Sequence, residues 1–191
     1  SLPGNHDPGN CDRDFLALAG GKIIVMHGDA VFPEVAPWSR MAMQKASELR
    51  QLIHAHPQDL VEQRFALARE VSRMLVPPTY PRKKNLLARV WEAITPPGRA
   101  WLMLRSWATM VSQTRWFAKR YFPSCEIMIC GHFHRGGVWE RDDLLVINTG
   151  SFMPPGGAYW CEWHDEYLRM GQLQKKSGRW NRGEIQGTWK I

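Results

Sequence analysis

The sequence has few cysteines and no long apolar segment. Its four cysteines, among 191 residues, form no C-x-x-C pair, so we expect no disulfide framework. No uncharged apolar run approaches the roughly 20 residues that span a bilayer. Thirteen prolines and sixteen glycines occur without a period, which excludes collagen-like and low-complexity proteins. With no signal peptide before the cysteines, these absences predict a cytoplasmic location with reduced thiols.

The overall composition is that of a globular domain. Hydrophobic residues make up 44% of the chain and charged residues 23%, which is enough to build one packed core. The chain begins at Ser1 without an initiator Met and without a strand before its first motif. We therefore expect it to be a piece of a longer protein.

Positive charge is concentrated in the middle of the chain. The net charge is +7 overall, but residues 33–123 carry 15 basic and 6 acidic residues, a net +9. Apolar residues recur there with helical spacing, which predicts an all-helical insertion over 33–123 with breaks at its prolines. These residues form two stripes, one with Val61, Phe65, Ala68, Ser72 and Leu75 and one with Trp101, Leu104, Ala108, Val111 and Ala118.

Three short aliphatic runs outside this segment are typical of buried strands. They are residues 22–26, 126–130 and 144–148, and each runs into a polar cluster. Ligands of open α/β sheets bind beyond the carboxyl ends of strands, so the three clusters are expected to converge. Residues 158–191 are predicted to add strands that close the edge of this sheet, with their tryptophans in the core.

The residues with ligand chemistry are mostly histidines. Imidazole and amide oxygen can bind Zn, Mn or Fe, and an H-x-H turn after a strand offers two imidazoles. Each residue alone also has a structural interpretation, such as a hydrogen-bonded histidine or, for Asp7, a helix N-cap. The candidates are Asn5, His6, Asp7, His27, His132 and His134.

In their order, these motifs resemble the calcineurin-like metallophosphoesterases. Gly4-Asn5-His6-Asp7, His27-Gly28-Asp29 and Gly131-His132-Phe133-His134 look like the last three motifs of that family, and the resemblance spans residues 4–151. It implies an α/β protein whose four-layer αββα sandwich surrounds two divalent metal ions, Mn, Fe or Zn. It also implies hydrolysis of phosphate monoesters, diesters or pyrophosphates by a two-metal-activated hydroxide.

The resemblance assigns a role to each candidate residue. Asn5, His27 and His132 would bind the second metal and His134 the first. His6 would stand beside the phosphate as proton donor or charge stabiliser, oriented by Asp7. Arg135, next to the second histidine of the turn, is a candidate contact to a substrate phosphate, with an ordinary surface arginine as the alternative.

Two motifs of the family, D-x-H and G-D-x-x-D, do not occur before the first recognised motif. In the family they supply the carboxylate ligands, which compensate the charge of the metal ions. We therefore expect the isolated 191 residues to be a poor enzyme and the complete parent protein to be a hydrolase.

The helical insertion sits where some relatives carry a cap. A partial resemblance to the UDP-diacylglucosamine hydrolases rests on this position and on the G-H-x-H-R turn, although His6 stands where that subgroup has Arg. Basic residues and tryptophans interleave in the insertion, and the leading interpretation is a helical cap with buried tryptophans and solvated charges. Peripheral contact with an anionic membrane is the first alternative to it, ahead of nucleic acid. A non-catalytic basic Trp-rich binding module is the alternative to an enzyme.

Overall fold

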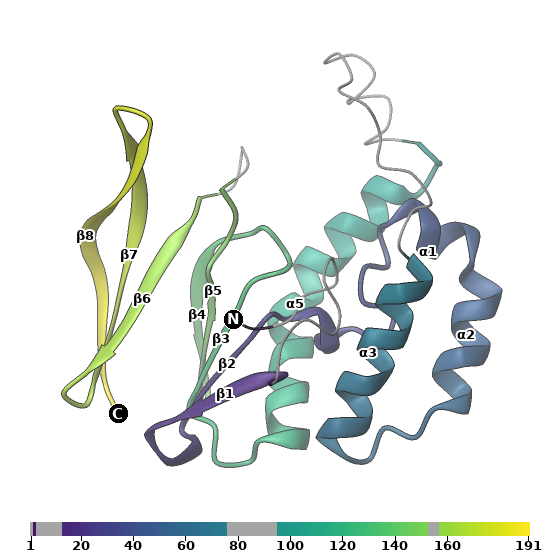
Figure 1. Cartoon of the computed structure of the whole chain (residues 1–191), viewed down its shortest axis with the longest axis horizontal. Helices are drawn as coiled ribbons and strands as arrows, with labels where there is room; N and C mark the ends of the chain where they lie inside the picture. The colour runs from purple at the N-terminus through teal and green to yellow at the C-terminus, as the bar shows by residue number, and fades with distance from the viewer. Residues whose placement is uncertain (1, 3–12, 76–94, 153–156) are drawn as a thin grey trace. The chain divides into compact units, whose positions relative to one another are not determined.

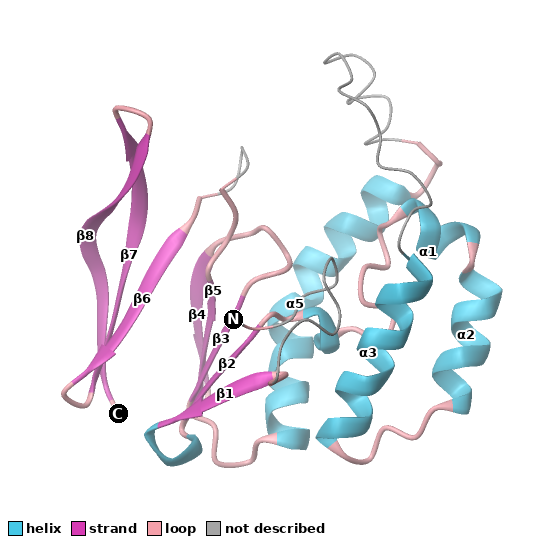
Figure 2. Cartoon of the chain, in the orientation of Figure 1, coloured by secondary structure: helices cyan, strands magenta, loops and turns pink. Residues whose placement is uncertain are grey.

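The computed structural model describes residue 2 and residues 13–75, 95–152 and 157–191 (Figure 1). Strands and helices occupy separate stretches of the chain (Figure 2). The strands are β1 (Phe15–Leu18), β2 (Ile23–Met26), β3 (Ile127–Cys130), β4 (Gly137–Arg141), β5 (Leu144–Asn148), β6 (Tyr159–His164), β7 (Tyr167–Lys176) and β8 (Arg179–Lys190). The helices are α1 (Arg40–Gln44), α2 (Ala46–Ala55), α3 (Val61–Leu75) and α5 (Arg99–Tyr121), with short 3-10 turns η1 (Ala19–Gly21) and η2 (Asp29–Val31).

These elements form two compact units. A helical unit contains residues 29–113, and a sheet unit contains residues 13–28 and 114–191, so the chain passes between the units within α5. No helix in the described part of the chain is long and apolar enough to cross a membrane. The interpretation of the chain as one domain with a cap at 33–123 stays a prediction.

The first sheet contains the three strands that the sequence predicts. Its order is β1-β2-β3-β5-β4, and β2, β3 and β5 run parallel to one another. β3 and β5 are buried along their whole length, and three of the four residues of β2 are buried. Buried parallel strands have apolar side chains on both faces, which is why they appear as continuous apolar runs in the sequence. The predicted mixed α/β architecture is confirmed at this level.

The C-terminal strands form a second sheet, so the prediction that they close the edge of the first sheet is wrong. β6, β7 and β8 pair antiparallel with one another only. In β7, Leu168 and Met170 alternate with more polar residues and pack against Ile23, Ile129 and Ile147 of the first sheet. A strand with one apolar face must cover that face, and here the two sheets cover each other.

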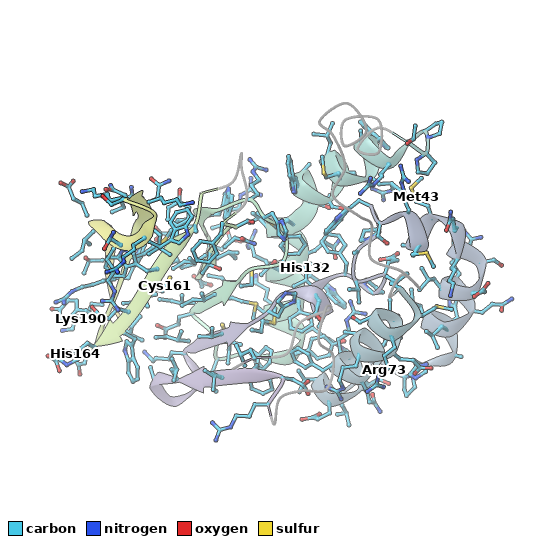
Figure 3. All side chains as sticks on the ribbon, turned by 45° about the horizontal axis from the view of Figure 1, so that its top comes forward. Met43, Arg73, His132, Cys161, His164 and Lys190 are labelled. Carbon is cyan, nitrogen blue, oxygen red and sulfur yellow. The ribbon has the colours of Figure 1, made fainter. Side chains whose placement is uncertain are left out.

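The expected burial of the C-terminal tryptophans is also only partly correct. Trp189 packs against the cluster between the sheets. Trp163 and Trp180 are instead exposed. His164 and Lys190 lie together at one end of the second sheet (Figure 3).

The C-terminal part of α5 lies on the other face of the first sheet (Figure 1). Its Phe117 is fully buried, and Phe122 after the helix meets Phe15 of β1 with ring centroids 4.8 Å apart. Within the sheet unit, the described layers are therefore helix, five-stranded sheet and three-stranded sheet.

The helices predicted from the two apolar stripes are present as α3 and α5, but the stripe of α3 is buried to a greater extent than that of α5. Phe65, Ala68 and Ser72 of α3 are buried. Trp101 and Leu104 of α5 are exposed, as is Ala108. The buried residues of α5 are Ser106, Met110, Thr114, Phe117 and Ala118.

The buried face of α5 differs from its apolar stripe in part because it includes the small polar side chain of Ser106. Ser106 Oγ donates a hydrogen bond to the carbonyl oxygen of Leu102 at 2.8 Å, within its own helix. A hydroxyl that is satisfied by its own backbone can be buried at little cost. The buried face of α5 therefore contains polar residues, and the spacing of apolar residues alone does not locate it.

Candidate functional site

The polar clusters after β2, β3 and β5 meet at one edge of the first sheet. Val25 is paired with Ile129, and Cys130 with Asn148, so the carboxyl ends of the three parallel strands lie side by side. The predicted convergence is confirmed for the described residues of these clusters.

His27 and His132 are brought together at this edge. Their ring centroids are 5.0 Å apart, and the rings make an angle of 65°. The backbone N–H of Gly131 donates to the carbonyl oxygen of His27 at 2.9 Å, which ties the two loops to each other. The side chain of His132 is buried.

Gly28 allows this close approach. Its φ of 107° lies in the region that L side chains rarely adopt. A Cβ at this position would stand 3.2 Å from Cβ of Cys130 and 3.4 Å from Cβ of His132. The absence of a side chain at Gly28 therefore keeps the two histidine loops in contact.

The loop that carries His132 has an unusual backbone. His132 and His134 both have positive φ values, 66° and 56°, although neither is glycine. Such a conformation costs on the order of 1–3 kcal/mol per residue and persists where surrounding contacts hold it. Phe133 between them is 1% exposed, and its N–H donates to the carbonyl oxygen of Gly131 at 2.7 Å. The buried phenyl ring thus anchors a strained turn with a histidine on each side.

Asn148 connects this turn to the end of β5. Its side chain is fully buried, and Nδ2 donates to the carbonyl oxygen of Gly131 at 2.7 Å. Oδ1 accepts from the N–H of Gly150 at 2.9 Å. Asn148 is a positioning residue to which the sequence analysis assigned no role. The signal was present, because it is the only polar residue at the end of an otherwise aliphatic run.

The other predicted site residues are placed differently. His134 is in the same turn as His132 but is exposed. Arg135 is also exposed, with its guanidinium carbon 5.8 Å from the centroid of the Trp139 ring. Asn5, His6 and Asp7 lie outside the described residues.

Two neighbouring imidazoles fit part of the coordination sphere of a first-row transition metal or zinc. His27 and His132 are such a pair of imidazoles. Within the described ranges, no group of three or more His, Cys, Asp or Glu side chains is placed to hold a metal ion. Both described donors are neutral imidazoles, which suit Zn or Fe better than Ca or Mg.

A scan against known protein families and a search of curated proteins find no match to this chain. Among solved structures, the chain is similar to Vacuolar Protein Sorting 29 from Cryptosporidium parvum. The sequence identity is 16% and the TM-score is 0.33, over 42% of this chain and 44% of that one. The chain thus spans less than half of that structure, and similarity at this level assigns no family.

Proposed function

We propose that this chain belongs to a metal-dependent phosphoesterase of the calcineurin-like type. The observation that supports this proposal most directly is the His27–His132 pair, whose ring centroids lie 5.0 Å apart at the ends of adjacent parallel strands. The strained turn that follows β3 and the buried Asn148 hold this pair in place. Strain kept at one turn by buried contacts is typical of functional sites.

The proposed fold is the αββα sandwich of that family. Three stacked layers support it, namely the C-terminal part of α5 and the two sheets. The fourth layer, a helix on the outer face of the second sheet, is not among the described elements.

The residue roles follow the motif resemblance. His27 and His132, with Asn5, would hold one divalent metal ion, and His134 would contribute to the other. When bound, two such ions lower the pKa of water and offset the charge of the phosphate. His6 would give a proton to the leaving oxygen, with Asp7 fixing its tautomer. Arg135, which is exposed, would contact a phosphate of the substrate.

Hydrolysis and metal binding test this proposal together. The full-length product of the gene is assayed with Mn²⁺ on an aryl phosphate and a bis-aryl phosphate, as wild type and as His132→Ala. The matched control is His164→Ala, because His164 is exposed and paired with Asp165 at 2.7 Å in the second sheet. We expect His132→Ala to lower kcat/KM by at least about 100-fold, as loss of a metal-site group does, and His164→Ala to leave it unchanged.

Metal affinity gives a second readout that does not depend on turnover. Calorimetric titration with Mn²⁺ should show weaker binding in His132→Ala and wild-type binding in His164→Ala. Equal activity and equal metal affinity in wild type and His132→Ala would overturn the proposal.

A non-catalytic basic surface remains the second candidate function. The first half of α5 favours it, because exposed Trp101 and Leu104 adjoin exposed Arg105. Such a mixture is attracted to anionic interfaces. Activity that depends on His132 would argue against a purely binding role. The basic residues of 82–89 lie outside the described part of the chain.

A further inference from the structure

The hairpin between β7 and β8 reaches the same end of the two-sheet sandwich as the candidate site. Gly150, just after β5, bridges to Ala158, just before β6. The first residue of β6, Tyr159, is paired with Gln172 of β7. The residues of β7 after Gln172 and the start of β8 therefore extend beyond the N-terminal end of β6. We call residues 173–182 the hairpin tip.

An aromatic pair connects the hairpin tip to the loop after β5. Phe152 lies four residues after Asn148, and its ring centroid is 4.9 Å from that of Trp180 in the hairpin tip. The two rings meet edge to face, at 68°. Phe152 is 59% exposed and Trp180 44% exposed, so ring surface remains open to solvent in both.

Positive charge surrounds these rings. The hairpin tip contains Lys175, Lys176, Arg179 and Arg182 and no acidic residue. Lys175 Nζ lies 6.0 Å from the centroid of the Trp180 ring. Arg182 Nη1 forms an ion pair with Glu162 at 2.7 Å, so it is the one cation of the four with a recorded carboxylate partner among the described residues. Three cations thus remain to attract an anion.

Exposed aromatic rings among cations match one ligand chemistry, flat bases joined by phosphates. Bases stack on aromatic side chains without regard to sequence, and lysine and arginine bind the phosphates between them. An anionic membrane would also be attracted by the charge. However, the turn of the hairpin consists of Ser177 and Gly178, and it offers no apolar side chain to the hydrocarbon region.

We propose that Phe152 and the hairpin tip bind single-stranded nucleic acid. This inference rests on the proposed phosphoesterase function and identifies the substrate class as single-stranded nucleic acid. The link between the two is the loop with Phe152, which begins at the strand ends that carry the histidines. Bases would stack on Phe152 and Trp180, and the backbone phosphates would pass from the cations of the hairpin tip toward His132.

The test is binding of a fluorescein-labelled oligothymidylate of about 12 nucleotides, a length within the site sizes of single-strand binders. Fluorescence anisotropy is measured with the full chain in EDTA, so that no metal is required. Trp180→Ala should weaken binding about 5- to 100-fold, as loss of one stacking ring does, and Trp180→Phe should restore most of the affinity. Trp163→Ala, which removes an exposed tryptophan at the other end of β6, is the matched control and should bind as wild type does.

The salt dependence tests the cations separately. For single strands, each neutralised phosphate contributes about 0.7 to the slope of log affinity against log salt. The double variant Lys175→Gln/Arg179→Gln should therefore lower the slope by about 1.4. The Arg141→Gln variant, at an exposed arginine of β4 beside the start of β5, should leave the slope unchanged.

Three outcomes would overturn the inference. They are unchanged oligothymidylate affinity in Trp180→Ala, a larger loss in Trp163→Ala than in Trp180→Ala, and binding of phosphatidylserine vesicles or of a mononucleotide that is as tight as that of the oligonucleotide. The phosphoesterase proposal fails on a different result, wild-type activity and metal affinity in His132→Ala. If binding in EDTA depends on Trp180, the hairpin tip binds nucleic acid whether or not the chain hydrolyses phosphate esters.

Discussion

Three cysteines illustrate what burial does to a single side chain. Burial raises the pKa of the Cys130 thiol from 9.0 to about 12, although a hydrogen bond from Asn148 works in the opposite direction. Burial likewise raises the pKa values of Cys125 and Cys161 to about 11. All three are free thiols. Because the thiolate is the reactive form, these cysteines should be inert near neutral pH.

Thiol reactivity tests this expectation. The variant Cys11→Ser removes the fourth cysteine, which lies outside the described residues. A pKa near 11 in place of 9.0 lowers the thiolate fraction at pH 8 about 100-fold. With an aromatic disulfide reagent at pH 8, we therefore expect the folded variant to react at least about 100-fold more slowly than the same variant in guanidinium. One thiol that reacts rapidly before unfolding would contradict the placement of these side chains.

The same pKa values set a direction for stability against pH. The folded state keeps these protons up to about pH 11, whereas the unfolded state loses them above about pH 9. Unfolding therefore releases protons in that interval, and the free energy of unfolding should fall as the pH rises from 9 to 11. Urea titrations should show a smaller fall over this interval in Cys130→Ala than in wild type.

At the scale of an element, one arginine joins α3 to the turn η2. Arg64 is 1% exposed, and its Nε donates to the carbonyl oxygen of Ala30 at 2.8 Å. Nη2 donates to the carbonyl oxygen of Val31 at 3.1 Å, and Nη1 donates to Gln58. These carbonyl groups would lose their partner without the guanidinium, at a cost of roughly 1–3 kcal/mol each.

Arg64→Ala should therefore lower the free energy of unfolding by about 3 kcal/mol or more, measured by urea denaturation. Arg73→Ala is the control in the same helix, because Arg73 is exposed near the end of α3 (Figure 3). We expect Arg73→Ala to change stability by no more than about 0.5 kcal/mol. Equal effects of the two substitutions would mean that the buried hydrogen bonds do not stabilise this unit.

Elements also differ in how far the sequence predicts them. β2, β3 and β5 are predictable because buried parallel strands are continuously apolar. The buried face of α5 is not, because Ser106 and Thr114 contribute to it. The separation of β6–β8 from the first sheet is not predictable from local pattern either, because it depends on the packing of Leu168 and Met170 against that sheet.

The candidate site, too, is predictable from the sequence only in part. The meeting of His27 and His132 is predictable from the rule that parallel strand ends share an edge. The positive φ values of His132 and His134 are not, because nothing in a histidine's chemistry requires that conformation. They depend on Phe133 and Asn148, whose burial appears only in the folded structure.

For the whole molecule, the contact between the two sheets is the main stabilising feature of the sheet unit. Leu168 of β7 is 1% exposed within the cluster between the sheets. Truncating a buried leucine costs its transfer free energy and leaves a cavity, about 2–5 kcal/mol in total. Leu168→Ala should lower the free energy of unfolding by that amount, measured by urea denaturation.

Ile185 on β8 gives the matched comparison. It is an exposed aliphatic residue of the same sheet, so Ile185→Ala should cost less than about 1 kcal/mol. A larger loss in Ile185→Ala than in Leu168→Ala would mean that the second sheet packs through its other face.

The central pair of the first sheet also sets an order of events during synthesis. Ile127 of β3 leaves the ribosome about 100 residues after its partner Ile23 of β2. At roughly 5–20 residues per second, the β1–β2 hairpin waits about 5–20 s before β2 can pair with β3. Every residue of the helical unit emerges during that interval. The nascent chain can therefore complete its helical unit before the central sheet exists, and the hairpin is the segment that a chaperone would need to shield.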